Sequence, residues 1–367
     1  QVSSALEARL VREGPLSELQ HLQSKDASIR WALLKMIFNL AALGDHLPCI
    51  WLEDIIRMTM DTLNQGIKII QRRQRYLESG RAMTPSTDEK KSDQGSEFYA
   101  VILLMQTLCR LACITGVPSA LLAKDIIHNI SAVVSVAYDC LLMSPSNQHP
   151  ELQEEKSQSV ELLELSCILL YYLSGTIKAA PRMIEAQCPE VLRDLWSKLL
   201  DIRSSSYAQE LNFAAVSMEL TTITVAVLGN LARHPFARNT LIEKGLTAEL
   251  ALLAQEHTVH LQMRRSGIEA IAETGTGHEH IDPVLSEKLL ATAVAALQEI
   301  AADDESANTI AQQGALRMLN VVATYASDIA LRTKAIMTIC NMLSSNSLEE
   351  LMTKVAEDMR AALDVLV

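Results

Sequence analysis

A short pattern that occurs twice constrains this chain more than any other feature. The stretches 237–254 and 306–323 share an Asn-Thr pair followed at the same distance by a glycine, at Asn239, Thr240 and Gly245 in one copy and at Asn308, Thr309 and Gly314 in the other. Each copy also follows a helix-like apolar run, 228–232 or 297–301. Self-similarity of this kind is typical of stacked repeats. The length of such a chain then indicates how many repeats it holds and not how many domains, because each repeat packs mainly on its neighbours.

The composition indicates that these repeats are helical. Hydrophobic residues make up 49% of the 367 residues, whereas aromatic residues make up only 4%. The core must therefore be aliphatic, and such a composition favours helices over a sandwich of strands, in which branched and aromatic residues dominate. We expect an all-α chain.

The net charge and the spacing of the cysteines argue against several kinds of partner, binding site and cellular location. The net charge of −12 opposes contact with a phosphate backbone, so we expect no nucleic-acid partner. Seven scattered cysteines lack the spacing of a disulfide framework or a zinc site, which favours a reducing compartment. We expect no membrane span and no secretion signal, because no apolar window is long enough and the first residues lack a basic segment followed by an apolar one. Gln1 stands where an initiator Met would, as in a piece of a longer protein.

Apolar spacing predicts a succession of helices interrupted by polar loops. Two polar stretches, 79–96 and 144–159, are expected to be flexible loops within one helical domain covering 1–367. The stretch 259–274 is expected to be the third helix of the unit that Gly245 opens. The two Asn-Thr pairs lie 69 residues apart, which is more than one unit of about 40 residues needs, so an extra helix or partial repeat is expected between them. The remaining expected helices are 16–22, 32–40, 48–78, 98–116, 120–143, 160–174, 184–200, 210–233, 284–302 and, as a cap, 348–367.

The stretch 10–45 makes the pattern more specific. A glycine opens a helix at Gly14, a polar turn at 24–26 leads into Ile29-Arg30, and a further helix closes on Asn39-Leu40-Ala41. This order resembles an armadillo repeat, and the resemblance extends to 228–254 and 306–345. It implies a right-handed α-solenoid of armadillo- or HEAT-like repeats.

Glycine suits the corner between a short first helix and the second, because a β-carbon is poorly tolerated where φ is positive. The expected corner residues are Gly14, Gly245 and Gly314. A degenerate copy over 160–200 places Gln187 at the glycine position and Tyr172 at the position of the Asn.

The resemblance also implies a concave groove, lined by third helices, that holds a protein or an extended peptide. The positions that match the groove-lining Asn of the family are Asn39, Asn230 and Asn341, and Lys35 and Arg332 complete the candidate partner-binding set. Import receptors of this family place a Trp one turn before each Asn, but here those positions hold Lys35, Ala226 and Met337, which argues against that class. The three Asn residues either pair with the backbone of a partner or are satisfied polar residues at helix ends.

Catalytic and metal-binding patterns are weak. Cys109 and Cys113 share a helical face without a second pair, and the stretch 275–280 combines glycines with His278 and His280 but lacks the Lys and the preceding strand of a phosphate loop. His257 and His260 likewise lack a ligand frame. We therefore expect no cofactor and no enzymatic activity.

Two functions remain open from the sequence. The first is a non-enzymatic interaction scaffold that docks a polypeptide. The second is a regulatory or autoinhibitory module, or an exchange or chaperone cofactor, that controls a catalytic or nucleotide-binding protein. A cytoplasmic location is expected, with nuclear or cytoskeletal association also open, and the oligomeric state stays undetermined.

Overall fold

The computed structural model describes residues 27–46, 49–78, 96–142, 150–204, 213–265 and 282–344. Within those ranges every regular element is an α-helix or a short 3-10 helix, so the all-α prediction is confirmed. The chain divides into two compact units, residues 1–173 and 174–367.

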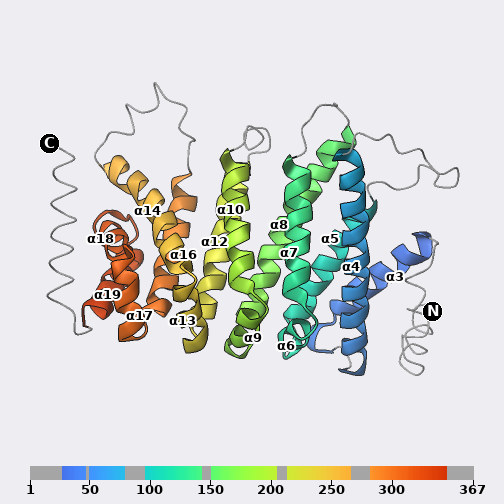
Figure 1. Ribbon diagram of the computed structural model, residues 1–367, viewed down its shortest axis with the longest axis horizontal. Helices are drawn as coiled ribbons and strands as arrows, with labels where there is room; N and C mark the ends of the chain where they lie inside the picture. The colour runs from blue at the N-terminus through green and yellow to red at the C-terminus, as the bar shows by residue number, and fades with distance from the viewer. Residues whose placement is uncertain are drawn as a thin grey trace. The chain divides into compact units, whose positions relative to one another are not determined.

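The first unit is built around a nearly all-apolar helix, α5 (Figure 1). This helix contacts α3 and α4, and its side chains Ile102, Met105 and Leu108 are almost completely buried. A helix that is apolar on most sides is stable only between neighbours, and this one is placed accordingly. The helices of this unit are α3 (Ala27–Ala41), η2 (Gly44–His46), α4 (Cys49–Glu78), α5 (Ser96–Ala112), α6 (Val117–Leu122), α7 (Ile126–Leu142) and α8 (Pro150–Ser174), which ends at the boundary between the units.

The second unit repeats one order of helices, a short one followed by two longer ones. The order occurs three times, as α9, α10, α12, then α13, α14, α16, then α17, α18, α19. The bounds are η3 (Ile177–Ala179), α9 (Ala180–Glu185), α10 (Cys188–Ser204), α12 (Phe213–Ala232), α13 (Pro235–Glu243), α14 (Leu246–Arg265), α16 (Pro283–Ile300), α17 (Asp304–Gln312), α18 (Ala315–Tyr325) and α19 (Ile329–Ser344).

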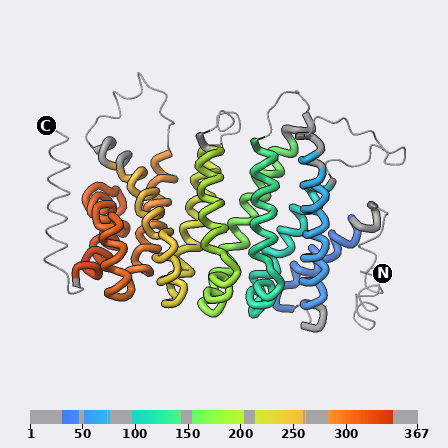
Figure 2. Tube along the Cα trace, in the orientation of Figure 1, coloured from blue at the N-terminus to red at the C-terminus, as the bar shows by residue number. Residues whose placement is uncertain are grey.

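Helices of the same class contact one another from repeat to repeat. The short helices α9, α13 and α17 form one such row, α14 contacts α18, and the third helices α12, α16 and α19 form another row. Figure 2 shows α12 and α16 running side by side. They approach closely at Gly229, where an added β-carbon would lie 3.2 Å from the Cα of Ala296. The repeat in the sequence thus corresponds to a repeat of packed helices.

The corner between the short helix and the second helix has one backbone signature. Gly245 and Gly314 have φ values of +76° and +96°, as predicted, and Gln187 adopts +62° at the equivalent corner of the degenerate copy. Asp125, between α6 and α7, adopts +58° and was not predicted. Nothing lies within 4 Å of a β-carbon built on either glycine, so backbone conformation and not space selects glycine there. Gly14 lies outside the described residues.

Several predicted boundaries were wrong. The polar stretch 144–159 is not a loop throughout, because α8 begins at Pro150. The helix expected over 120–143 is two helices separated by a break at 123–125. The stretch 259–274 is not a third helix, since its first residues belong to α14 and the third position is taken by α16.

The expected extra helix between the two Asn-Thr pairs is also not among the described residues. Between α13 and α17 they contain only α14 and α16, and the surplus length falls in 266–281, outside the described part. The stretch 79–95, the loop 275–280 and the predicted cap 348–367 lie outside it as well.

One described helix, α12, is by itself long and apolar enough to cross a membrane. More than half of its most apolar window, 56%, is buried inside the structure, where α12 contacts α10 and α16. The helix also carries the exposed Glu219. These contacts are those of a core helix.

Candidate functional site

Six helices carry a side chain at an equivalent position near their last residue: α12, α16 and α19, which are the third helices of the second unit, and α3, α5 and α8 of the first unit, which we also count as third helices. This residue precedes an apolar residue and, in most copies, a small residue that closes the helix, as in Asn230-Leu231-Ala232. We call this set the third-helix register. In the first unit it comprises Asn39, Arg110 and Tyr172, and in the second unit it comprises Asn230, Glu299 and Asn341.

Arg110 links two register positions in the first unit. Its guanidinium carbon lies 3.6 Å from the centroid of the Phe38 ring, and its Nη1 donates to the carbonyl oxygen of Phe38 at 3.3 Å. Phe38 directly precedes Asn39, so the exposed ends of α3 and α5 lie together. A guanidinium over an aromatic face is attracted by the ring quadrupole, which holds the Arg110 side chain in place. Nearer the start of the same two helices, the ring centroids of Trp31 and Tyr99 lie 5.3 Å apart.

Contacts between α5 and α8 continue this face. Gln106 donates to Oε1 of Glu161 at 2.9 Å, and the thiol of Cys109 approaches the carbonyl oxygen of Leu165 at 3.5 Å. At the end of the helices the exposed Cys113 interacts with Tyr172 and, together with burial, raises the pKa of that phenol.

Helices α5 and α8 expose two tyrosine rings and one guanidinium. Tyr99 and Tyr172 remain 49% and 39% exposed, and Arg110 is exposed on α5, the helix that also carries Tyr99. We call Tyr99, Arg110 and Tyr172 the aromatic-arginine cluster. These residues supply two exposed ring surfaces and a cation that is held over Phe38.

The register of the second unit is polar. Asn230 is half-buried, and its Nδ2 donates to Oγ of Ser174 at 3.1 Å. Glu299 lies 3.4 Å from Nε of Arg233. Asn341 is exposed, and one turn earlier Met337 leaves 52% of its surface exposed.

The predicted partner-binding residues are divided between the two units. Lys35 and Asn39 are exposed on α3 of the first unit, whereas Asn230 and Asn341 lie on α12 and α19 of the second unit, with α16 between these two helices. Arg332 is exposed, but its Nε donates to the carbonyl oxygen of Ala323 at 3.0 Å, a contact that ties α19 to the end of α18.

The sequence did not identify Arg110 or Glu299 as register residues, and it treated Tyr172 only as a degenerate substitution. The signal that could have found them is the apolar residue and small residue that follow each one, Leu111-Ala112 and Ile300-Ala301 among them.

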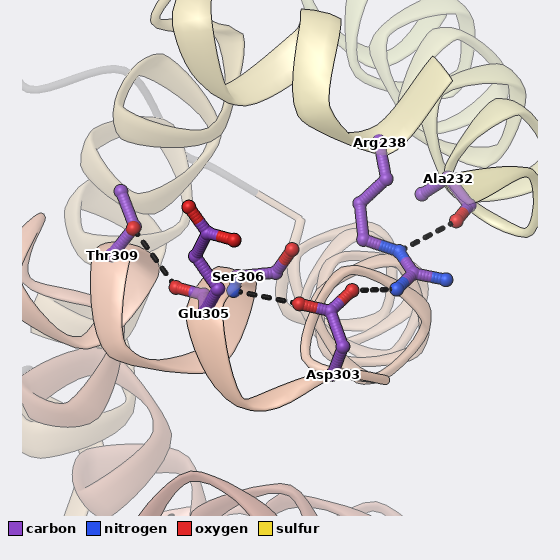
Figure 3. Close-up of polar contacts among 6 residues, drawn as sticks. All are labelled: Ala232, Arg238, Asp303, Glu305, Ser306 and Thr309. Atoms are coloured by element: carbon purple, nitrogen blue, oxygen red, sulfur yellow. Dashed lines mark hydrogen bonds and ion pairs between the residues drawn. The ribbon is translucent and has the colours of Figure 1, made fainter. Parts of the chain in front are cut away.

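Charged contacts on the short helices have a structural role. Figure 3 shows Arg238 of α13, whose guanidinium pairs with Asp303 and whose Nε donates to the carbonyl oxygen of Ala232 at 3.1 Å. Asp303 is the N-cap of α17 and accepts from the backbone N–H of Ser306 at 2.8 Å. Burial alone would raise the pKa of Asp303, but the Ser306 hydrogen bonds and Arg238 outweigh it and hold that pKa below its ordinary value. These bonds join consecutive repeats.

A second set of charged contacts joins the preceding pair of repeats. Arg193 of α10 lies 2.8 Å from Glu249 of α14, and Lys244 at the end of α13 pairs with Glu190. The side chains of the Arg193 pair are about 40% exposed, so each such pair stabilises the fold by ~0.2–1 kcal/mol at most.

Cys109, Cys188 and His257 are buried. Burial, with a smaller effect of Cys113, raises the pKa of Cys109 to about 12, and burial likewise raises the pKa of Cys188 to about 12. His257 is buried with Nδ1 3.2 Å from Oγ of Ser286. No group of three or more His, Cys, Asp or Glu side chains in the described ranges is arranged to hold a metal ion.

Neither a family model nor a curated protein sequence matches the chain. Among solved structures, the chain is similar to one from work on a conserved phosphorylation switch that controls the interaction between cadherin and β-catenin. The alignment covers 93% of this chain and 62% of that one, at 10% sequence identity and a TM-score of 0.28. The chain thus spans less than two thirds of the matched chain.

Proposed function

We propose that the protein is a non-enzymatic scaffold, an α-solenoid of armadillo type, that binds a polypeptide along its third helices. The short-long-long order of helices, the left-handed corner residues and the contacts between helices of one class support this architecture. Stacked repeats of this kind offer extended surfaces on which one helix class is exposed repeatedly.

The observation that carries the proposal is the aromatic-arginine cluster. Side chains that dominate binding energy at protein interfaces are most often Trp, Tyr and Arg, since they offer large rigid surfaces and directed hydrogen bonds at a small entropic cost. Arg110 is already held over Phe38, so little conformational freedom of this side chain would be lost on binding.

The polar register residues supply a second element of recognition. An Asn amide has two donors and an acceptor and can pair with the backbone of an extended peptide whatever its sequence. Asn39 and Asn341 are exposed, and Asn230 is half-buried and donates to Ser174.

A direct test compares two variants with a matched control. One variant replaces Tyr99 and Arg110 by Ala and the other replaces Asn39 and Asn341 by Ala. The control replaces Lys68 and Ile69 of α4, which are exposed on a second helix of the same unit.

Each protein, shown to be folded by circular dichroism, is used to capture partners from lysate, and captured polypeptides are then cross-linked to the wild type. We expect the first variant to capture about tenfold less of the partner than the wild type does, or even less. The second variant should show a smaller loss of captured partner, and the control should capture as much as the wild type. Cross-links that map to second helices, or equal capture by all variants, would contradict binding along the third helices.

The proposal includes an intracellular, reducing location. The six cysteines whose side chains the structure describes form no disulfide, and several are core residues whose thiols stay protonated. Measuring stability with and without reductant tests this, because a scaffold from an oxidising compartment would lose stability when reduced.

A further inference from the structure

Helix α5 leaves a single stripe of its surface open in the first unit. Between residues 98 and 112 every side chain is buried except three: Tyr99, Gln106 and Arg110. At 100° per residue these three lie within about 40° of one another, so they belong to one side of the helix. Helix α3 adjoins this stripe where Phe38 contacts Arg110, and helix α8 adjoins it where Glu161 accepts from Gln106.

The charge changes sign across these three helices. Helix α3 has two basic residues and no acidic one, and α5 has one residue of each sign. Helix α8 has five glutamates and a single basic residue, Lys156, which is buried. The exposed charges follow the same order, with Lys35 on α3, Arg110 on α5 and Glu164 on α8. Positive charge therefore lies on the α3 side of the stripe and negative charge on the α8 side.

The two cations lie close together where α3 meets α5. Trp31 and Phe38 both contact residues of α5, and at 100° per residue Lys35 falls within about 60° of each on α3. Phe38 is one turn after Lys35 and carries the guanidinium of Arg110 over its ring. We call Lys35 and Arg110 the cation pair.

The protein does not neutralise the cation pair. Neither side chain forms an ion pair with a carboxylate of the described residues. In the second unit, by contrast, Arg233 lies 3.4 Å from the register residue Glu299. The cation pair can therefore bind an anionic group from another molecule, and a guanidinium suits a carboxylate because it can donate two parallel hydrogen bonds to it.

The acidic side is equally open. Glu161 is half-buried and accepts only the neutral amide of Gln106, and Glu164 is exposed one turn further along α8. Packed helices lie ~8–10 Å apart, and an extended chain advances ~3.3 Å per residue. A bound segment would thus pass from the cation pair to the two glutamates in about three or four residues.

We propose that the first unit recognises an extended polypeptide segment with an acidic residue and a basic residue about three or four positions apart. The acidic residue binds the cation pair, and the basic residue binds Glu161 and Glu164. This inference rests on the proposed scaffold function and gives the chemistry of the partner. A segment that is acidic or basic throughout would be repelled on one side of the stripe, so the change of sign selects against both.

Peptide selection on the full chain tests this chemistry without a known partner. Random dodecapeptides displayed on phage are selected on the wild type, and the enriched peptide is synthesised with a fluorescent label. A second peptide has its acidic and basic residues exchanged. We expect the enriched peptide to carry both signs at the stated spacing, and fluorescence anisotropy should show that the exchange weakens binding to the wild type about tenfold or more.

Two variants that keep the net charge locate the binding. The charge-exchanged variant combines Lys35→Glu with Glu164→Lys, and the matched control combines Lys334→Glu with Glu243→Lys in the second unit. All four side chains are exposed, so both variants should fold, which circular dichroism verifies. We expect the charge-exchanged variant to prefer the exchanged peptide, whereas the control should prefer the original one as the wild type does. Loss of a merely structural contact would weaken both peptides alike.

The possible results separate this inference from the scaffold proposal. If peptides are enriched but bind the wild type and the charge-exchanged variant equally, or if they carry one sign only, the proposed chemistry is wrong and the scaffold proposal stands. If no peptide is enriched on the wild type, the result counts against both.

Discussion

Exchanging residue types at the left-handed corners should move stability in opposite directions at two equivalent positions. Gly314→Ala places a β-carbon on a backbone with φ of +96°, whereas Gln187→Gly removes one from a backbone with φ of +62°. Both positions join a short helix to the second helix of a repeat. We expect the first change to destabilise the fold and the second to stabilise it.

The magnitude follows from backbone terms alone. A residue with a β-carbon costs ~1–2 kcal/mol in the left-handed region, and replacing Gly by Ala recovers about 0.4–1 kcal/mol by restricting the unfolded chain. Nothing lies within 4 Å of the added β-carbon at Gly314, so no packing term enters. Gly314→Ala should therefore lower the free energy of unfolding by about 1 kcal/mol, and Gln187→Gly should raise it by a similar or smaller amount.

Urea denaturation followed by circular dichroism, together with hydrogen exchange of α18 and α10, measures these changes. A loss of about 1 kcal/mol corresponds to exchange in α18 that is roughly fivefold faster. Gly314→Asn serves as a control, because Asn tolerates the left-handed region and should cost less than Ala. If Gly314→Ala were neutral, or if Gln187→Gly destabilised α10, the argument that positive φ selects the corner residue would be refuted.

Two further changes probe the contacts between repeats. Gly229→Ala should destabilise the protein by about 1–2 kcal/mol, since overpacking against the backbone of Ala296 exceeds the gain in helix propensity, and Ala296→Gly should restore part of the loss in urea denaturation. Asp303→Asn should keep the cap on Ser306 but abolish the ion pair with Arg238. Because the pKa of Asp303 is depressed in the folded state, the wild type should lose the stabilisation from this pair as the pH falls below ~4. The free energy of unfolding of the variant should change less with pH in that range. Asp303→Ala should cost about 1 kcal/mol more than Asp303→Asn at neutral pH through loss of the cap.

The repeat was predictable because its defining residues are buried or backbone-constrained. Gly245 and Gly314 recur since the corner needs positive φ, and the apolar residues around them recur since neighbouring repeats bury them. The start of α8 was missed for the opposite reason. Its first turns are rich in Glu, Gln and Lys, which a composition argument assigns to a loop, yet these are strong helix formers and Pro150 suits a first helical position. Glu155 and Lys156 are even buried.

The candidate site was less predictable because packing does not fix an exposed position. In the third-helix register the following residues, such as Leu111 and Ala112, are held constant by burial, while the register residue itself varies among Asn, Arg, Tyr and Glu. Searching for Asn therefore found half of the register and overlooked Arg110, whose contact with Phe38 joins residues 72 positions apart. The buried neighbours identify where a helix exposes a side chain at this position, whereas the chemistry of that side chain has to be taken from each position separately. If the proposed scaffold binds a polypeptide through the first unit, its specificity should follow Tyr99, Arg110 and Tyr172 more closely than Asn39.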